Sequence, residues 1–337
     1  MPSDKILNIG RLHCPVEYLK ESLFFSLVDY RNNYFTSDDP NKVIEFYNSF
    51  ENRDQLIQWM RERPKGVATI NEVEGEKDVI IVIPTADFNG QYAIECRENI
   101  FKDLHIVFVE SGGREDFYFN IAHNFNVGIR KAMEYNPKWV VFSGDDMYKI
   151  DEVSILRNQL TKLDNNKIDL VFTKKSAYHS IPARFSKQRI TRQIILKAIW
   201  KRKFGGSLLK PFFDIEKKFQ CEYFLSQRTG FTFLLYKKGY ILTSFTDFGL
   251  FSSEYIRRLA GIVFDETFVN AQEDHDFILR AFLRGIRLTR INYKIGDYVG
   301  RSMGTGFIRT LRELAGIAYL NQKWASIFSN SKSLKKD

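Results

Sequence analysis

Residues 138–151 have the sequence KWVVFSGDDMYKID, and this stretch decides the fold class that we expect. Residues 139–142 are β-branched or aromatic, which predicts a short buried strand. A Ser-Gly pair ends the strand, and the carboxylates of Asp145 and Asp146 follow directly. Carboxylates at the C-terminal end of a strand in an α/β sheet lie where such folds bind ligands, and they suit Mg²⁺ or Mn²⁺. The alternative is an aspartate-rich turn that caps the next helix.

Two apolar strands are predicted before this one, at residues 79–83 (VIIVI) and 105–109 (HIVFV). Continuous apolar strands that alternate with helices predict a mixed, mostly parallel sheet with helices on both faces. The first two strands end in Thr85 and Glu110. Because right-handed crossovers bring such strand ends to one edge, we expect these residues to lie near Asp145. This expectation favours a ligand site over a simple helix cap.

Other elements are predicted around these strands. Helices are expected at residues 92–101 and around 124–132, and further strands at 170–173 (LVFT) and 231–236 (FTFLLY). Neither a P-loop lysine motif nor a G-x-G-x-x-G motif follows the strands. The pattern therefore disfavours kinase-type and dinucleotide-binding functions.

The N-terminal part, residues 1–75, is predicted to be a helical extension. One helix is expected to start at the acidic cap and proline of SDDP (residues 37–40), and another covers 52–63 and stops before Pro64. Residues 71–78 (NEVEGEKD) are polar and acidic, which predicts a linker.

Composition indicates a globular protein. The chain has 337 residues, of which 44% are hydrophobic and 27% charged. Three separated cysteines predict neither a disulfide framework nor a metal knuckle, so we expect a reducing compartment. No apolar run approaches the length of a membrane span. A cytoplasmic location is therefore expected.

The net charge of +9 predicts acidic partners. Residues 184–203 are strongly basic and carry apolar residues at helical spacing, within a predicted helical insertion at about 184–220. Such a helix either binds an anionic membrane surface, which would make the protein peripheral on the cytoplasmic face, or packs its apolar stripe on the main domain. Nucleic acid is not an expected partner, because no nucleic-acid-binding signature accompanies the segment.

A second acidic group begins the predicted helix EDHDFILR at residues 273–280. Glu273, Asp274 and Asp276 fall in its first turn, where carboxylates also favour the helix dipole. Residues 306–337 are expected to form a C-terminal helix and a basic tail.

Two blocks of sequence together resemble the family 2 nucleotide-sugar glycosyltransferases of the GT-A (Rossmann-like) fold. The first block contains VIIVIPT, IVFVESGG, NFNVGIRKA and VVFSGDDM, between residues 79 and 147. The second is FGLFSSEYIRRLAGIVFDETFVNAQEDHDFILRA, residues 248–281. The likeness covers about residues 78–301 and implies a GT-A domain at 76–305.

The resemblance implies a role for each matching residue. The donor-binding residues it implies are Pro84, Thr85, Glu110, Asn126, Asp145 and Arg301. Asp145 and Asp146 would hold Mn²⁺ or Mg²⁺ against the sugar diphosphate. Asp274 would be the catalytic base, with Glu273 beside it and Asp276 in reserve.

The chain departs from the family pattern at two places. Ser143 or Gly144 stands where many members carry the first Asp of the DxD motif, so the metal has fewer protein ligands. No histidine follows the acidic helix, and the resemblance implies Arg301 or Ser302 at the diphosphate instead.

The leading hypothesis is thus an inverting, metal-assisted hexosyltransferase. It would use a UDP-, GDP- or dTDP-sugar and an acceptor hydroxyl on a glycan or a lipid-linked molecule. Displacement of a diphosphate needs its charge neutralised and a general base near the incoming hydroxyl. The alternatives are a nucleotidyltransferase with a similar sheet, and a non-catalytic basic protein that binds nucleic acid or anionic lipid.

Overall fold

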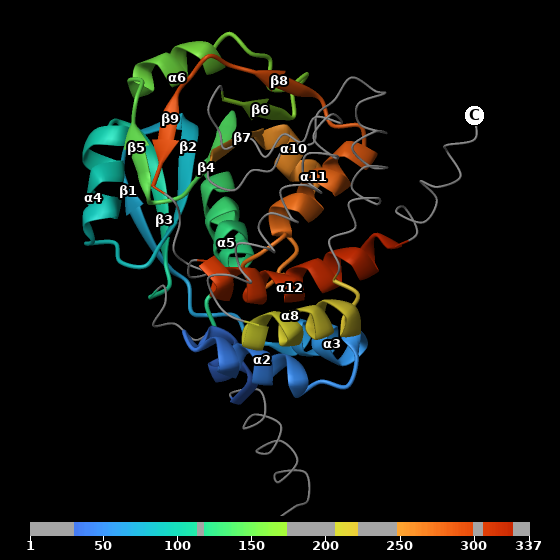
Figure 1. Cartoon of the computed structure of the whole chain (residues 1–337). Helices are drawn as coiled ribbons and strands as arrows, with labels where there is room; N and C mark the ends of the chain where they lie inside the picture. Colours follow the sequence, from blue (N-terminus) through green and yellow to red (C-terminus); the bar gives the residue numbers. More distant parts are fainter. Residues whose placement is uncertain (1–29, 113–117, 174–205, 222–247, 299–305, 326–337) are drawn as a thin grey trace, which may run out of the picture.

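A seven-stranded mixed sheet forms the centre of the protein in a computed structural model, which describes residues 30–112, 118–173, 206–221, 248–298 and 306–325. The strand order is β1-β3-β2-β4-β7-β6-β8 (Figure 1). The strands are β1 (Thr69–Val73), β2 (Glu76–Thr85), β3 (Leu104–Glu110), β4 (Trp139–Ser143), β6 (Leu170–Phe172), β7 (Phe248–Ser252) and β8 (Leu288–Arg290).

Five of the seven strands run in the same direction. β2 pairs in parallel with both β3 and β4, and β6 pairs in parallel with β8. β1 and β7 run antiparallel to their neighbours. The predicted α/β class with a mostly parallel sheet flanked by helices is confirmed at this level.

Each central strand buries both of its faces. In β2, Ile80 and Val82 face a core that also includes α5 (Ile121–Met133), whereas Ile81 and Ile83 face a core that includes α6 (Val153–Leu160). Because residues alternate between the two faces, a strand covered on both sides must be apolar throughout. This requirement explains why the runs at 79–83, 105–109 and 139–142 predicted their strands correctly.

The predicted linker at 71–78 is wrong. Residues 69–73 form β1, an edge strand antiparallel to β3, and β2 already begins at Glu76. The burial of β1 is intermediate to exposed, so its sequence needs no apolar run. The N-terminal extension predicted as helical therefore contains a strand of the central sheet.

The remaining described elements complete the fold. Two helical segments lie on the face of the sheet that α6 covers: α4 (Gln91–Glu95) and a π-helix η1 (Cys96–Ile100). A small two-stranded sheet of β5 (Met147–Lys149) and β9 (Ile295–Asp297) lies on the same face. The helices α10 (Ser253–Arg258) and α11 (Glu273–Leu283) follow β7. The helix predicted at 273–280 is confirmed and extends three residues further.

A layer of helices packs against one end of the sheet (Figure 1). It consists of α2 (Pro40–Asn48), α3 (Arg53–Glu62), α8 (Gly206–Lys218) and α12 (Gly306–Lys323). Asp39 and Asn52 cap α2 and α3 as the sequence predicted, and Pro40 is the first residue of α2.

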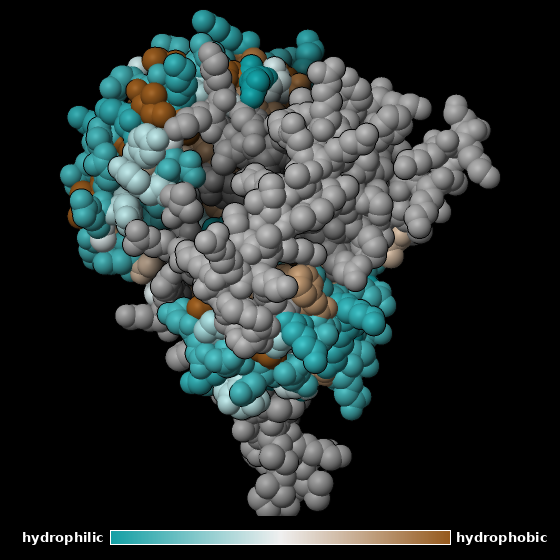
Figure 2. Space-filling model, in the orientation of Figure 1, coloured by the Kyte–Doolittle hydropathy of each residue, from teal (hydrophilic) through white to brown (hydrophobic). Residues whose placement is uncertain are grey.

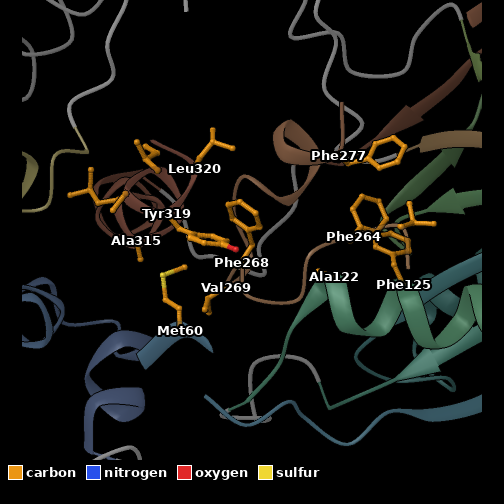
Figure 3. Close-up of a cluster of buried hydrophobic side chains, with 14 of the residues drawn as sticks. Met60, Ala122, Phe125, Phe264, Phe268, Val269, Phe277, Ala315, Tyr319 and Leu320 are labelled. Atoms are coloured by element: carbon orange, nitrogen blue, oxygen red, sulfur yellow. The ribbon is translucent and has the colours of Figure 1, made fainter. Parts of the chain in front are cut away.

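One hydrophobic core joins this layer to the sheet. Figure 3 shows Phe268 and Val269 between Met60 of α3, Tyr319 of α12 and the side chains on α5. The buried Tyr47 hydroxyl donates to Leu311 O at 2.6 Å and accepts from Ala315 N at 3.0 Å. N-terminal and C-terminal helices are thus held together by buried contacts.

Figure 2 shows a mostly hydrophilic surface on the described part of this face, with small separated brown patches. Within the described ranges, no helix combines the length and apolarity needed to cross a membrane. The predicted basic segment 184–203, the strand 231–236, Arg301 and the C-terminal tail from residue 326 lie outside the described residues.

Candidate functional site

The C-terminal ends of β2 and β4 meet at a point where the direction of the chain connections changes. From β2 the chain crosses to β3 on one side, and β4 lies on the other side. Open α/β sheets bind ligands in the crevice at such a switch point. Thr85 ends β2 here, and its hydroxyl donates to Asp145 Oδ2 at 2.7 Å. Two strand ends that the sequence placed at one edge are therefore in direct contact.

The Asp145 carboxyl is partly buried, and burial raises its pKa above the ordinary value. The hydrogen bond from Thr85 offsets part of this effect. No basic side chain in the described ranges forms an ion pair with Asp145. A cation bound beside Asp145 would favour its charged form.

Glu110 connects the neighbouring strand ends. Its Oε1 accepts from Phe88 N at 3.2 Å, and its Oε2 accepts from Asn71 Nδ2 at 3.0 Å. The carboxylate therefore ties the loop after β2 to the edge strand β1. This arrangement holds the loop after β2 against the end of β3.

Asp146 completes a carboxylate pair with Asp145 at the turn after β4. A Cβ atom added at Gly144 would lie only 2.7 Å from Asp146 Oδ1, so a side chain at residue 144 would displace the Asp146 carboxylate. Tyr298 N donates to Asp146 O at 2.8 Å, which anchors the turn to the end of β9. The glycine thus lets the Asp146 carboxylate fold back over the turn.

The carboxylate pair fits a divalent ion only if other oxygens join it. In the part of the chain that the structure describes, no group of three or more His, Cys, Asp and Glu side chains is arranged to hold a metal. Mg²⁺ is commonly bound by one or two carboxylates together with substrate phosphates and water. Asp145 and Asp146 are two such carboxylates, and the other ligands of an ion held there would have to come from a bound molecule and water.

The acidic turn, residues 273–276 at the start of α11, is the second part of the candidate site. Asp274 is 4% exposed, and its Oδ1 accepts from His275 N at 2.8 Å and lies 3.1 Å from His275 Nδ1. Burial, and then the charge of Asp274, raises the pKa of Glu273 to about 8. At neutral pH Glu273 is therefore mainly protonated.

The loop that leads into the acidic turn has an unusual backbone. Asn270 and Gln272 have φ angles of 57° and 73°, in the left-handed region that non-glycine residues rarely adopt. A Cβ atom added at Gly316 of α12 would lie 2.4 Å from Ala271 O. The loop is therefore pressed directly against α12. Backbone strain of this kind concentrates at functional sites.

Helix α5 links the loop before the acidic turn to the end of β3. The helix begins beside that strand end, where Asn124 Nδ2 donates to the Ser111 hydroxyl just after β3, at 2.8 Å. The loop before α11 joins the same end of α5, because Ile121 N donates to Asn270 Oδ1 at 2.8 Å. These contacts connect the loop before α11 to the end of α5 that lies beside the end of β3.

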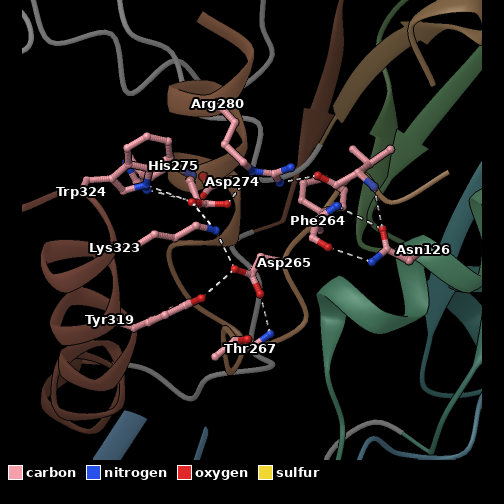
Figure 4. Close-up of polar contacts among 12 residues, drawn as sticks. Asn126, Phe264, Asp265, Thr267, Asp274, His275, Arg280, Tyr319, Lys323 and Trp324 are labelled. Carbon is pink, nitrogen blue, oxygen red and sulfur yellow. Dashed lines mark hydrogen bonds and ion pairs between the residues drawn. The ribbon is translucent and has the colours of Figure 1, made fainter. Parts of the chain in front are cut away.

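Asn126 does not line the C-terminal edge of the sheet, which corrects its assignment to donor binding. It is fully buried, and its Nδ2 donates to Phe264 O at 2.8 Å and to Glu266 Oε1 at 2.9 Å (Figure 4). Its Oδ1 accepts from Val263 N and Phe264 N at 3.1 and 3.0 Å. All of these contacts hold the loop before α11.

Asp276 is likewise a supporting residue and no reserve base. It is fully buried and accepts from Arg280 Nε at 2.8 Å and from Trp324 Nε1 at 2.9 Å. Lys323 Nζ lies 2.9 Å from its Oδ1. Figure 4 shows this network between α11 and α12, where it fixes the direction of α11.

Pro84 is buried within β2 opposite Val109, so it shapes the strand end rather than presenting a polar group. Arg301 lies outside the described residues.

Sequence reasoning missed several residues of the site. Asn71 was hidden in the predicted linker, and Tyr298 follows a three-residue strand with no apolar pattern. The Cys96 thiol donates to Asp145 O, with Sγ 3.4 Å from that oxygen. Burial raises the pKa of this thiol. Only His275 carried a visible signal, because it directly follows Asp274 in the sequence.

Comparisons with protein-family models, with curated proteins and with solved structures find no match for this chain.

Proposed function

We propose that this protein is an inverting glycosyltransferase that moves a sugar from a nucleoside-diphosphate donor to an acceptor hydroxyl. The observation that carries the proposal is the 2.7 Å hydrogen bond between Thr85 and Asp145 across neighbouring parallel strands. It supports a ligand site at the topological switch point with a partly buried carboxylate at its base. The GT-A fold that the sequence resembles is part of the same proposal, and the strand order with its parallel centre is compatible with it.

In this proposal the nucleoside lies against the loop after β2. Glu110 holds that loop through Phe88 N, and Thr85 orients Asp145 toward the diphosphate. A bound Mg²⁺ or Mn²⁺ would neutralise the diphosphate as it leaves. The carboxylate pair would hold that ion.

Asp274 is the proposed general base. The acceptor oxygen forms a bond to the anomeric carbon while the bond from that carbon to the diphosphate oxygen breaks. The electron pair of the broken bond leaves with the diphosphate, and the hydroxyl proton passes to Asp274. Attack from the side opposite the diphosphate inverts the anomeric centre. A general base of this kind contributes about 10²–10⁴-fold to the rate.

Asp274→Asn tests the proposed base. The full chain is incubated with UDP-, GDP- and dTDP-sugars and mixed glycan acceptors, and release of nucleoside diphosphate is measured. We expect Asp274→Asn to bind nucleotide like the wild type while release falls by about 10²-fold or more.

Asp164→Asn is a matched control, because Asp164 lies in an exposed turn and pairs with Lys167. It should release nucleotide at the wild-type rate. Unchanged release by Asp274→Asn would remove Asp274 from the proposed chemistry.

A further inference from the structure

Three tyrosines form a cluster beside the carboxylate pair. Tyr298 lies with its ring centroid 5.0 Å from that of Tyr148 and 6.3 Å from that of Tyr92. We call Tyr92, Tyr148 and Tyr298 the tyrosine cluster. Tyr92 and Tyr298 are 50% and 54% exposed. Three separate elements contribute to it: α4, β5 and the end of β9, which Figure 1 shows near one another.

The small sheet of β5 and β9 turns the cluster outward. Met147 and Ile295 are buried and face the core, so the alternation of the strands directs Tyr148 and Gly296 to the other face. Tyr148 pairs with Gly296 across the two strands. A Cβ atom added at residue 296 would lie 2.0 Å from Tyr148 Cζ. The ring of Tyr148 therefore lies across the Gly296 backbone in a fixed position.

The cluster is attached to the candidate site. Tyr148 follows Asp146 by two residues, and Tyr298 N donates to Asp146 O at 2.8 Å. A ligand on these rings would therefore lie next to the turn that carries Asp146. Large exposed aromatic groups that meet in one place mark binding surfaces more often than scattered apolar residues do.

The chemistry of the cluster favours a neutral sugar chain. A pyranose ring presents a face of C–H groups to an aromatic ring and a rim of hydroxyls to polar groups, and tyrosine supplies both an apolar face and a hydroxyl. The cluster itself contains no basic side chain that could form an ion pair with a phosphate or an anionic lipid headgroup. Rigid aromatic side chains also lose little entropy on binding.

We infer that the tyrosine cluster is a subsite for a neutral oligosaccharide acceptor, stacked on Tyr92, Tyr148 and Tyr298 beside the carboxylate pair. The inference rests on the proposed function for the role of that ligand as acceptor. Binding of the oligosaccharide itself depends only on the cluster.

Saturation-transfer NMR on the full chain tests the subsite. The probes are neutral oligosaccharides of two to six glucose, galactose, mannose or N-acetylglucosamine units. We expect at least one series to bind, and Tyr298→Ala and Tyr92→Ala to weaken it about five- to tenfold, the worth of one aromatic stacking contact. Tyr298→Phe should retain most of the binding.

Tyr30→Ala is the matched control, because Tyr30 is 43% exposed and its ring contacts that of Tyr34. Its oligosaccharide binding should equal that of the wild type. Gly296→Ala adds a second variant, since it displaces the Tyr148 ring without removing any tyrosine, and binding should weaken again.

Nucleotide titrations with the same variants separate this inference from the proposed function. UDP, GDP or dTDP should bind Tyr298→Ala as tightly as the wild type. Nucleotide binding without any oligosaccharide binding would overturn the subsite and leave the proposed function standing. Loss of nucleotide binding in Tyr298→Ala would assign the cluster to the donor and overturn the inference. Binding of anionic vesicles that depends on the tyrosines would also overturn it, in favour of a membrane surface.

Discussion

Single residues of the site act mainly by close approach and hydrogen bonding. Thr85 contacts Asp145 directly, and Gly144 makes room for the Asp146 carboxylate. A side chain at residue 144 would meet Asp146 Oδ1 at 2.7 Å, so the Asp146 carboxylate would have to move away from its observed position.

Gly144→Ala tests this steric contact. The added Cβ displaces the Asp146 carboxylate, so nucleotide affinity in the presence of Mn²⁺ should fall by about tenfold, as expected when a charge-assisted contact is lost. Calorimetry on the folded variant measures the change. Ser143→Ala removes only a hydrogen bond to Gly144 O and should bind like the wild type. Full affinity in Gly144→Ala would contradict the steric account.

Glu273 gives the folded protein a pH dependence. Its pKa lies near 8 in the folded state against an ordinary 4.5, so between these values the folded state binds more protons than the unfolded state. The free energy of unfolding therefore falls as pH rises through this window. Glu273→Gln removes the titrating group and should raise the free energy of unfolding at pH 8 by about 1–3 kcal/mol, with little change at pH 4.5.

Urea unfolding of both proteins at pH 4.5, 6.5 and 8 measures this difference. Glu51→Gln serves as the control, because Glu51 is exposed, its carboxylate accepts from the neighbouring Gln55 Nε2, and its loss should leave the pH profile unchanged. A Glu273→Gln protein whose stability follows the wild-type profile would show that Glu273 titrates normally.

At the scale of elements, α12 packs against the acidic turn and the loop that precedes it. Trp324 and Lys323 contact Asp276, and Lys323 with Tyr319 also binds Asp265, which lowers the pKa of Asp265 to about 2. Gly316 lets the Ala271 carbonyl rest on the helix. The C-terminal helix thus determines where α11 begins, although it contributes no residue to the proposed chemistry.

Gly316→Ala tests this coupling between elements. The new methyl group would meet Ala271 O at 2.4 Å, and a backbone atom cannot move aside without shifting the loop. We expect a loss of about 1–3 kcal/mol in stability and a drop in sugar transfer with nucleotide affinity retained. Ala318→Gly lies two residues away on α12 and provides a destabilised control whose loop is not displaced. If Gly316→Ala and Ala318→Gly were equally stable and transferred sugar at the same rate, the coupling between α12 and the loop before α11 would be ruled out.

At the scale of the whole molecule, sequence reasoning found the parts whose burial is two-sided. The strands at 79–83, 105–109 and 139–142 were predictable because each is apolar on both faces. β1 was missed because an edge strand with partial exposure needs no apolar pattern. β5 and β9 were missed because three-residue strands from distant parts of the chain carry no periodicity.

The residues of the candidate site also divide into those that the sequence predicted and those that it did not. Thr85, Glu110 and Asp145 were predictable, since crossover rules bring parallel strand ends to one edge. Asn126 was misplaced because its partner Phe264 lies 138 residues further along the chain, and nothing near Asn126 in the sequence signals that contact. The supporting role of Asp276 was hidden for the same reason, because two of its partners, Lys323 and Trp324, lie at and just after the end of α12.

Nucleotide binding tests the central claim most directly. UDP, GDP and dTDP are titrated calorimetrically into the full chain, with and without Mn²⁺, and into Thr85→Val and Asp145→Asn. The account predicts that at least one nucleotide binds the wild type and that both variants weaken it by about tenfold or more, because each loses the contact across the switch point. Absence of binding for all three nucleotides to the wild type, under both conditions, would contradict the assignment of this sheet edge to a nucleotide-sugar donor.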